Sequence, residues 1–449
     1  MVEQVLELLE KKKYPAVKKA LLSMHEADIA EIFEEISDDS EVLLRLFRLL
    51  PKEQAAEVFS YMEGDVQQRI IEAITDTELK YILDNMYLDD YVDLVEEMPA
   101  NVVKQIINNS SANNRGLINQ YLQYPDDSAG SIMTNEYVYL KKDITVAQAF
   151  EVIRKTGVKK ETVNTCYVTS ADRKLIGEVS ALALLVADPK ARVGDIMEAA
   201  PIRVHTLDDK EDVAKQFSHY DLLAMPVVDN EDRLVGLITI DDAVDVLQEE
   251  NTEDFERMAG ITQGPTNATY LKTPVVQLAK GRIVWLMVLM ISGMITGALL
   301  ESYEAALAAV PLLVAFIPML MDTGGNSGCQ SSTMVIRGLA LDEIEWGDFF
   351  RVMWKEIRVA LLCGAALAAV NFVRIWIQYK DINVALVVSL TLVGTVLIAK
   401  SLGCILPLLA KKIKLDPAIM ASPLITTIAD ACTLLVYFAF AARFLSLHM

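Results

Sequence analysis

An apolar run of 18 residues, IVWLMVLMISGMITGALL, covers residues 283–300 and contains no charged side chain. Runs of this length are typical of helices that cross a lipid bilayer. Further apolar runs begin near Ala305 and cover roughly residues 358–378, 384–410 and 418–445. The sequence therefore predicts a transmembrane domain with five helices over residues 276–449.

Charge is distributed unevenly along the chain. Residues 1–282 carry 51 Asp and Glu against 30 Lys and Arg, a net charge of −21, whereas residues 283–449 carry 11 of each and are neutral. This balance indicates an acidic soluble part fused to a membrane domain. Such a part lacks the basic patches that bind phosphate backbones, so we expect no nucleic-acid partner and a preference for cationic ones.

The basic residues predict the orientation of the membrane domain, because cytoplasmic connections are enriched in Lys and Arg. The connections on the other side carry only Arg374, Lys380 and Arg443. We therefore expect a multi-pass protein of the cytoplasmic membrane, with the acidic part inside and the C-terminus outside. The basic residues of the cytoplasmic side are Lys280, Arg282, Arg337, Arg351, Lys355, Arg358, Lys411, Lys412 and Lys414.

The last apolar run contains a carboxylate near its middle, Asp430 in SPLITTIADACTLLVYFAFA. Inserting a carboxylate at the centre of a spanning helix costs about 2.5–3.5 kcal/mol, so a partner is expected. One candidate partner is Lys400 in the preceding span; the other is a cation that passes along this face. Oxygen donors suit hard cations, which favours the cation pathway over hydrogen bonding between helices. The polar residues that share the helical face are Ser422, Thr426, Asp430, Thr433 and Tyr437.

The second apolar run is interrupted by Pro311 and Pro318 and leads into MDTGGNSGCQSST, residues 321–333. From Ala305 to Arg337 a continuous helix would be about 50 Å long, longer than a bilayer core of about 30 Å. Either the helix protrudes or it is broken at the glycines. We predict that residues 322–333 line a pore or its mouth; the alternative is a plain interfacial loop.

The acidic part contains two kinds of repeat. LPKEQAAEVFSYM, ITDTELKYILDNM and MPANVVKQIINNS begin at Leu50, Ile74 and Met98, a 24-residue interval. Each copy has a helical apolar pattern, so we predict an α-helical superhelical domain over residues 1–130.

A second repeat, with a period near 60 residues, occupies residues 131–250. Its copies, GSIMTNEYVYLKKDITVAQAFEVI and GDIMEAAPIRVHTLDDKEDVAKQF, resemble a tandem pair of α/β cystathionine-β-synthase (CBS) domains. In the second copy Thr239 and Asp242 match the family's G-h-x-[S/T]-x-x-D pattern, which grips phosphate and ribose. The first copy has Ser180 but lacks the Asp. The resemblance implies a candidate site for ATP or another adenine nucleotide at Thr239 and Asp242, although many CBS pairs bind nothing.

The helical repeat, the CBS pair, an acidic connecting helix and five spans together resemble the MgtE family of magnesium channels over the whole chain. The specific motifs are GGNSGCQSSTMVIRGLA (324–340), AKSLGCILPLLAKKIKLDPA (399–418) and SPLITTIAD (422–430). Asp430 matches the family's pore carboxylate, which holds hydrated Mg²⁺, and Thr426 matches the position whose backbone carbonyl faces the ion. Asp416 matches an acidic residue at the cytoplasmic mouth; its simpler role is to cap a helix before Pro417.

Residues 251–275 resemble the plug helix of the family, which connects the sensor to the pore. The acidic stretch DVLQEENTEDFERM (245–258) precedes the membrane domain, and acidic runs are usually solvated helix faces. Its position here predicts regulatory Mg²⁺ ligands. The candidates are Asp245, Glu249, Glu250, Glu253 and Asp254.

These observations predict a homodimeric, Mg²⁺-selective uptake channel that closes when intracellular Mg²⁺ binds the acidic domains. Two copies of Asp430 across a two-fold axis would supply −2 to face a +2 ion. We find no nucleophile–base set and expect no enzyme. The alternatives are a secondary transporter or exporter of divalent cations, and a membrane-anchored metal or nucleotide sensor without transport.

Overall fold

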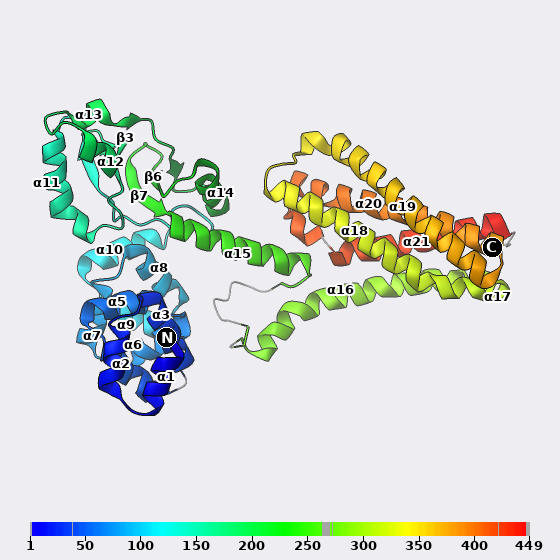
Figure 1. The fold of residues 1–449 in the computed structure, drawn as a ribbon, viewed down its shortest axis with the longest axis horizontal. Helices are drawn as coiled ribbons and strands as arrows, with labels where there is room; N and C mark the ends of the chain where they lie inside the picture. The colour runs from blue at the N-terminus through cyan, green and yellow to red at the C-terminus, as the bar shows by residue number, and fades with distance from the viewer. Residues whose placement is uncertain (1, 38, 263–269, 272, 421, 446–449) are drawn as a thin grey trace. The chain divides into compact units, whose positions relative to one another are not determined.

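The computed structural model describes residues 2–37, 39–262, 270–271, 273–420 and 422–445. The chain divides into two compact parts (Figure 1). We name them the acidic unit (Met1–Glu250) and the membrane unit (Asn251–Met449).

The first half of the acidic unit is a stack of short helices. Thr75 begins α7 with a capping box, in which its side chain accepts from the Glu78 backbone N–H and the Glu78 carboxylate accepts in return. Pro51 and Pro99 occupy the same position before α5 and α9, so the N-caps recur every 24 residues and the predicted helical repeat is confirmed. The helices are α1 (Val2–Glu10), α2 (Tyr14–Leu21), α3 (Glu26–Glu35), α4 (Ser40–Phe47), α5 (Lys52–Ser60), α6 (Gly64–Ala73), α7 (Asp76–Leu83), α8 (Leu88–Glu97), α9 (Ala100–Asn109) and α10 (Ala112–Tyr121).

The second half of the acidic unit contains two small sheets with matching topology. In each copy the first strand runs parallel to the second, and the second pairs antiparallel with the third. This duplication confirms the predicted tandem α/β pair. The strands are β1 (Tyr139–Lys141), β2 (Thr165–Thr169), β3 (Leu175–Ser180) and β4 (Glu198–Ala199) in one sheet, and β5 (Val204–His205), β6 (Ala224–Val228) and β7 (Leu234–Thr239) in the other. The helices are α11 (Val146–Thr156), the 3₁₀ turn η1 (Gly157–Lys159), α12 (Ala181–Val186), α13 (Val193–Ile196) and α14 (Lys210–Tyr220).

One hydrophobic core joins the helical repeat to the second α/β copy. Phe59 and Tyr91 of the repeat belong to the same buried cluster as Phe217 and Ile238. Apolar surface that is shared in this way makes the acidic unit one folded body. Side chains of α8 therefore lie in the same body as the first residues of α15 (Ile240–Met258), which follows β7 directly.

The membrane unit is built from long helices. Four of the described segments are long and apolar enough to cross a bilayer: Val275–Ser302, Trp346–Tyr379, Ile382–Lys412 and Pro417–Leu445. The elements are α16 (Val275–Ser302), α17 (Glu304–Ala309), η2 (Pro311–Phe316), α18 (Ile317–Ala340), η3 (Trp346–Asp348), α19 (Phe349–Tyr379), α20 (Ile382–Lys412), η4 (Pro417–Met420) and α21 (Ser422–Leu445).

The second predicted span consists of three elements, α17, η2 and α18. Its helix is not broken at the glycines, because α18 runs through Gly324, Gly325 and Gly328 without interruption. The break lies earlier, at the 3₁₀ turn that begins with Pro311, where proline removes a backbone donor. At about 36 Å, the 24-residue α18 is long enough to span a bilayer, although it is too polar to be recognised by composition. The count of five spans remains a prediction.

The predicted connecting helix over residues 251–275 is not a separate element among the described residues. Residues 251–258 are the end of α15, and residues 259–262 are not helical. Residues 263–269 and 272 lie outside the described residues. The helix that contains residues 251–258 begins at Ile240, inside the predicted α/β pair.

Candidate functional site

A cavity of about 160 Å³ lies between α18 and α21 in the membrane unit. Thr426 and Asp430 reach it from α21, one helical turn apart, so two of the predicted pore residues share one site. From α18 come residues of the polar segment predicted to line a pore. The lining residues are Met321, Asp322, Gly325, Asn326, Cys329, Thr426 and Asp430.

Glycines of α18 allow the two helices to approach. A Cβ at Gly325 would lie 2.9 Å from Thr426 Cγ2, and one at Gly324 would lie 2.9 Å from Thr433 Oγ1. Real Cβ atoms do not approach so closely, so a larger residue at either position would force α18 and α21 apart. The small residues of the GGNSG motif therefore serve packing, as in other membrane helices.

The cavity is negatively charged. Its lining includes two carboxylates, Asp322 and Asp430, and no Lys, Arg or His. Asp430 Oδ1 is fully buried, and among the described residues nothing donates a hydrogen bond to it. The amide of Asn326 donates to Asp322 Oδ1 over 3.0 Å. A buried carboxylate oxygen without a basic partner favours a cation in the cavity.

Asp430 also lines a second cavity of about 440 Å³, to which α16 contributes Leu289, Gly293 and Thr296. Sequence analysis did not connect this helix with Asp430. Among the described atoms, nothing lies within 4 Å of a Cβ built at Gly293 or Gly297. These glycines therefore do not serve close helix packing within the chain.

Lys400 does not pair with Asp430. It is buried in α20 and donates to Ser331 Oγ over 3.2 Å, while Ser331 donates in turn to the Glu356 carboxylate of α19. The predicted alternative of a Lys400–Asp430 pair is therefore wrong. Helical spacing in one span could not show this, because Ser331 and Glu356 lie on two other helices.

The polar face of α21 has two functions along its length. Thr426 and Asp430 line the cavity, whereas Thr433 and Tyr437 are buried against neighbouring helices. The Tyr437 hydroxyl donates to the Leu313 carbonyl over 3.0 Å, which anchors η2. The polar face therefore serves interhelical packing and hydrogen bonding at Thr433 and Tyr437, and it lines the cavity at Thr426 and Asp430.

Asp416 caps the short helix η4, because its Oδ1 accepts from the Ala418 backbone N–H over 2.7 Å. Its other oxygen pairs with Arg257, which also pairs with Glu253 one turn earlier in α15. A cation at Asp416 or Glu253 would have to compete with this arginine. The metal-binding role of both residues remains a prediction.

Carboxylates of α8, of the loop after η1 and of the start of α15 raise one another's pKa in the acidic unit. Desolvation, reinforced by Asp90, raises the pKa of Asp89 to about 7. Desolvation and the charge of Asp89 likewise raise the pKa of Asp242 to about 7 and that of Glu161 to about 8. We call this group the carboxylate cluster; its members are Asp89, Asp90, Asp93, Glu161 and Asp242.

Sequence analysis assigned Asp242 to a nucleotide site and did not connect it with the other members of the cluster. Asp89 and Asp90 were visible only as part of an acidic helix face, and Glu161 lies in a loop without a motif. Only the tertiary structure, which places α8 beside the start of α15, brings these residues together. Thr239 donates to Asp242 Oδ2 over 2.8 Å, so the two residues of the nucleotide motif lie together.

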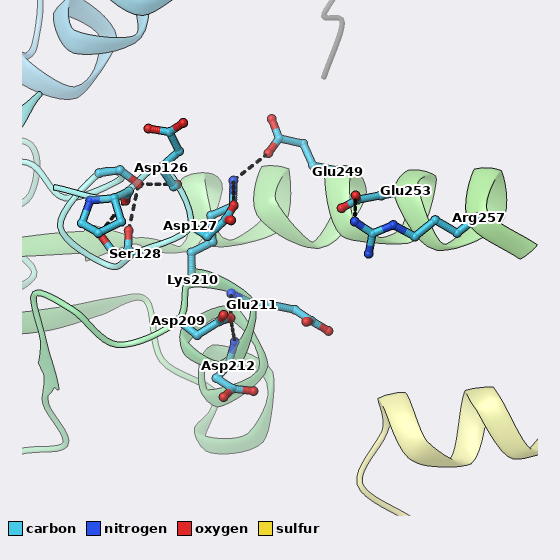
Figure 2. Close-up of polar contacts among 12 residues, drawn as sticks. Asp126, Asp127, Ser128, Asp209, Lys210, Glu211, Asp212, Glu249, Glu253 and Arg257 are labelled. Atoms are coloured by element: carbon cyan, nitrogen blue, oxygen red, sulfur yellow. Dashed lines mark hydrogen bonds and ion pairs between the residues drawn. The ribbon is translucent and has the colours of Figure 1, made fainter. Parts of the chain in front are cut away.

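Two of the predicted ligands on α15, Glu249 and Glu253, have basic neighbours (Figure 2). Glu249 lies 3.5 Å from Lys210 Nζ, which is also 3.9 Å from Asp127. Burial raises the pKa of Glu250 and of Asp245 above the ordinary range. Asp254 makes contacts of its own within the chain. Among the described residues, no three His, Cys, Asp or Glu side chains are arranged to hold a metal ion, so the structure does not assemble these residues into one site.

Three family profiles match successive parts of the chain. Residues 24–127 match the MgtE intracellular N domain, and residues 129–189 and 193–249 match the CBS domain. Residues 317–440 match MgtE, described as a divalent cation transporter. The profiles follow the same order as the predicted domains.

Similar proteins match over nearly the full length. The magnesium transporter MgtE of Thermus thermophilus is 34% identical over 97% of this chain and 96% of its own. That of Bacillus subtilis is 30% identical over 99% and 97%. A crystal structure of the cytosolic domain of the Mg²⁺ channel MgtE in complex with ATP is 31% identical, with a TM-score of 0.51, and covers 55% of this chain and all of that one.

Proposed function

Because this chain belongs to the MgtE family of magnesium transporters, we propose that it is a homodimeric, Mg²⁺-selective uptake channel of the cytoplasmic membrane. The observation that carries the proposal is the cavity at Asp430, which has two carboxylates and no basic residue in its lining. A carboxylate at membrane depth that lacks a permanent partner is stabilised by the cation that passes it.

The chemistry of the lining suits magnesium. Mg²⁺ dehydrates reluctantly and is bound through one or two carboxylates with several waters retained. Asp430 supplies charge, and Asn326 and Thr426 supply neutral oxygen atoms for those waters. A two-fold axis through the pore would bring a second chain's cavity opposite the first, and cyclic dimers are the commonest closed assembly.

Regulation belongs to the acidic unit. Its carboxylate cluster has like-charged neighbours, and Mg²⁺ bound there would replace protons and relieve repulsion. We propose that intracellular Mg²⁺ selects a closed state in this way, because it binds that state better than the open one. The predicted ligands Asp245, Glu249, Glu250, Glu253, Asp254 and Asp416 would extend this regulation along α15 and to the pore mouth.

A nucleotide is a further proposed ligand of the acidic unit. The related cytosolic domain was crystallised with ATP, and Thr239 and Asp242 of this chain keep the hydroxyl and carboxylate of the motif within 2.8 Å. Asp242 would then take part in both nucleotide binding and the carboxylate cluster. ATP and Mg²⁺ binding to this unit are therefore expected to be coupled.

The test is Mg²⁺ influx into liposomes that contain the purified full-length protein. Asp430→Asn should reduce influx about a hundredfold, the rate equivalent of about 2.7 kcal/mol. Asp381→Asn is the matched control: Asp381 caps α20 by accepting from Asn383 and Val384, and asparagine can do the same. Equal influx for Asp430→Asn and the parent would contradict the proposal, and light scattering of the same preparation tests for the dimer.

The alternative functions are separated by the same preparation. Single-channel currents identify a channel, whereas a secondary transporter gives only slow, saturable flux. A sensor without transport predicts no influx from any variant. If Mg²⁺ on the cytosolic face leaves the open probability unchanged, the regulatory part of the proposal is wrong.

A further inference from the structure

We propose that Asp322 is a second carboxylate of the cation site, so that each chain offers a two-carboxylate site formed by Asp322 and Asp430. This inference rests on the proposed transport of Mg²⁺ through the cavity. It differs from the sequence-based expectation, in which the second negative charge at the ion came only from Asp430 of another chain.

The geometry places both carboxylates at one cavity from different helices. Asp322 belongs to α18 and Asp430 to α21, and both are part of the lining. Asn326, one turn after Asp322, donates through its side-chain amide to Asp322 Oδ1 over 3.0 Å and to the Asp322 carbonyl over 2.9 Å. A carboxylate held by a neighbouring amide is already oriented before an ion arrives.

The ordinary structural roles of an aspartate do not account for Asp322. It lies five residues after Ile317, where α18 begins, and is therefore too far along the helix to be its N-cap. Among the described residues it makes no ion pair with Lys, Arg or His. Asp322 is exposed at the cavity, and a carboxylate that neither caps the helix nor pairs with a base can bind a cation that enters there.

The charge and size of the cavity fit a hydrated dication. Two carboxylates carry −2 against +2, so one chain can neutralise the ion by itself. The cavity of about 160 Å³ is more than ten times the space of about 10–15 Å³ that one water molecule needs by the same measure. A dication can therefore keep several waters between itself and both carboxylates, as Mg²⁺ prefers. A monovalent ion would leave one negative charge uncompensated.

Cys329 provides a native reporter of occupancy, because its thiol belongs to the same lining. In full-length protein with Cys166, Cys363, Cys404 and Cys432 replaced by alanine, a charged methanethiosulfonate reagent should label Cys329 more slowly as Mg²⁺ is added. We expect Asp322→Asn to need about tenfold more Mg²⁺ for half-maximal protection. Asparagine keeps an oxygen that can accept from Asn326, so the variant removes charge and little else.

Two further variants and a second readout complete the test. Asp322→Glu, which restores the charge, should recover most of the protection, and Asp381→Asn should behave as the parent. The Mg²⁺ concentration for half-maximal influx into liposomes should shift in parallel with protection. A stability effect alone would move neither concentration, and size-exclusion chromatography checks that each variant is folded.

The outcomes distinguish this inference from the proposed function. If Asp430→Asn loses influx while Asp322→Asn keeps parental protection and half-maximal concentration, the channel proposal stands and the role of Asp322 is wrong. If the parent itself shows no Mg²⁺ influx, the proposed function falls and the inference with it. A tenfold shift for Asp322→Asn with recovery by Asp322→Glu supports both.

Discussion

In the membrane unit the buried Lys400 is linked to a carboxylate, whereas in the acidic unit buried carboxylates have other carboxylates as their main charged neighbours. Lys400 is linked through Ser331 to Glu356, but Asp89, Asp90 and Asp242 each have another carboxylate as a main charged neighbour. Permanent pairing gives a rigid scaffold. Unrelieved repulsion gives a body whose stability depends on the cations around it.

The largest effect on stability is expected when Lys400, the matched charge of the membrane unit, is replaced. Lys400→Met should lower the free energy of unfolding by about 3 kcal/mol, because Ser331 and the half-buried Glu356 lose their basic partner. Thermal unfolding in detergent measures the loss. The double variant Lys400→Met/Glu356→Gln should recover most of it, since a neutral amide needs no countercharge. If the double variant is as unstable as the single one, charge matching is not what Lys400 provides.

A second test compares two glycines of the membrane unit. A Cβ at Gly403 of α20 would overlap the Gly328 carbonyl of α18, so Gly403→Ala should cost about 1–3 kcal/mol through overpacking. Gly293→Ala is the matched control, because nothing described lies within 4 Å of a Cβ there. Its unfolding temperature in detergent should equal that of the parent or exceed it slightly. Equal losses for both variants would contradict the packing described here.

In the acidic unit, neutralising one carboxylate of the cluster should raise the stability of the protein. Asp242→Asn should stabilise the metal-free protein by about 1 kcal/mol, because it removes one like charge from the cluster. The same variant should gain less stability from added Mg²⁺ than the parent does. Thermal unfolding with and without Mg²⁺ measures both effects, and Asp143→Asn, an exposed aspartate outside the cluster, is the control. If Asp242→Asn is less stable than the parent without metal, repulsion among the carboxylates of the cluster does not lower the stability of the protein.

The smallest expected effect is on pH dependence. Asp89 and Asp242 have folded pKa values of about 7, above the ordinary aspartate value of 3.8. The folded state therefore holds more protons than the unfolded state between these values, so stability falls as pH rises through the window. Without Mg²⁺, the unfolding temperature of the acidic unit should drop by about 2–4 °C between pH 6 and pH 8. Saturating Mg²⁺ should reduce the drop, and an increase with pH would contradict the cluster.

Periodicity and local motifs predicted much of the fold. The 24-residue interval predicted helices that begin at matching positions near Pro51, Thr75 and Pro99, because a repeated cap and a repeated apolar pattern act locally. Asp430 and Thr426 were predicted as neighbours because helical spacing fixes one turn between them.

Contacts between distant segments could not be predicted in the same way. The placement of Asp322 opposite Asp430, and of Glu161 near Asp89 and Asp242, depends on how helices and loops pack. The glycines of the GGNSG motif suggested a broken helix, since glycine weakens isolated helices. In the structure, packing against α20 and α21 outweighs this local preference. Sequence alone offered Lys400 a single partner, Asp430, and pointed to neither Ser331 nor Glu356.

The glycine contacts of the membrane unit also restrict how the cavity can change its width. Gly328 and Gly403 bring the backbones of α18 and α20 together, and Gly325 brings α18 against Thr426 of α21. Helices packed at this distance cannot slide past one another without a clash, so we expect α18, α20 and α21 to move as one rigid group. By contrast, α16 borders the second cavity at Gly293 with open space around it. Of the helices around Asp430, α16 is therefore the one whose displacement we expect to change the width of the second cavity.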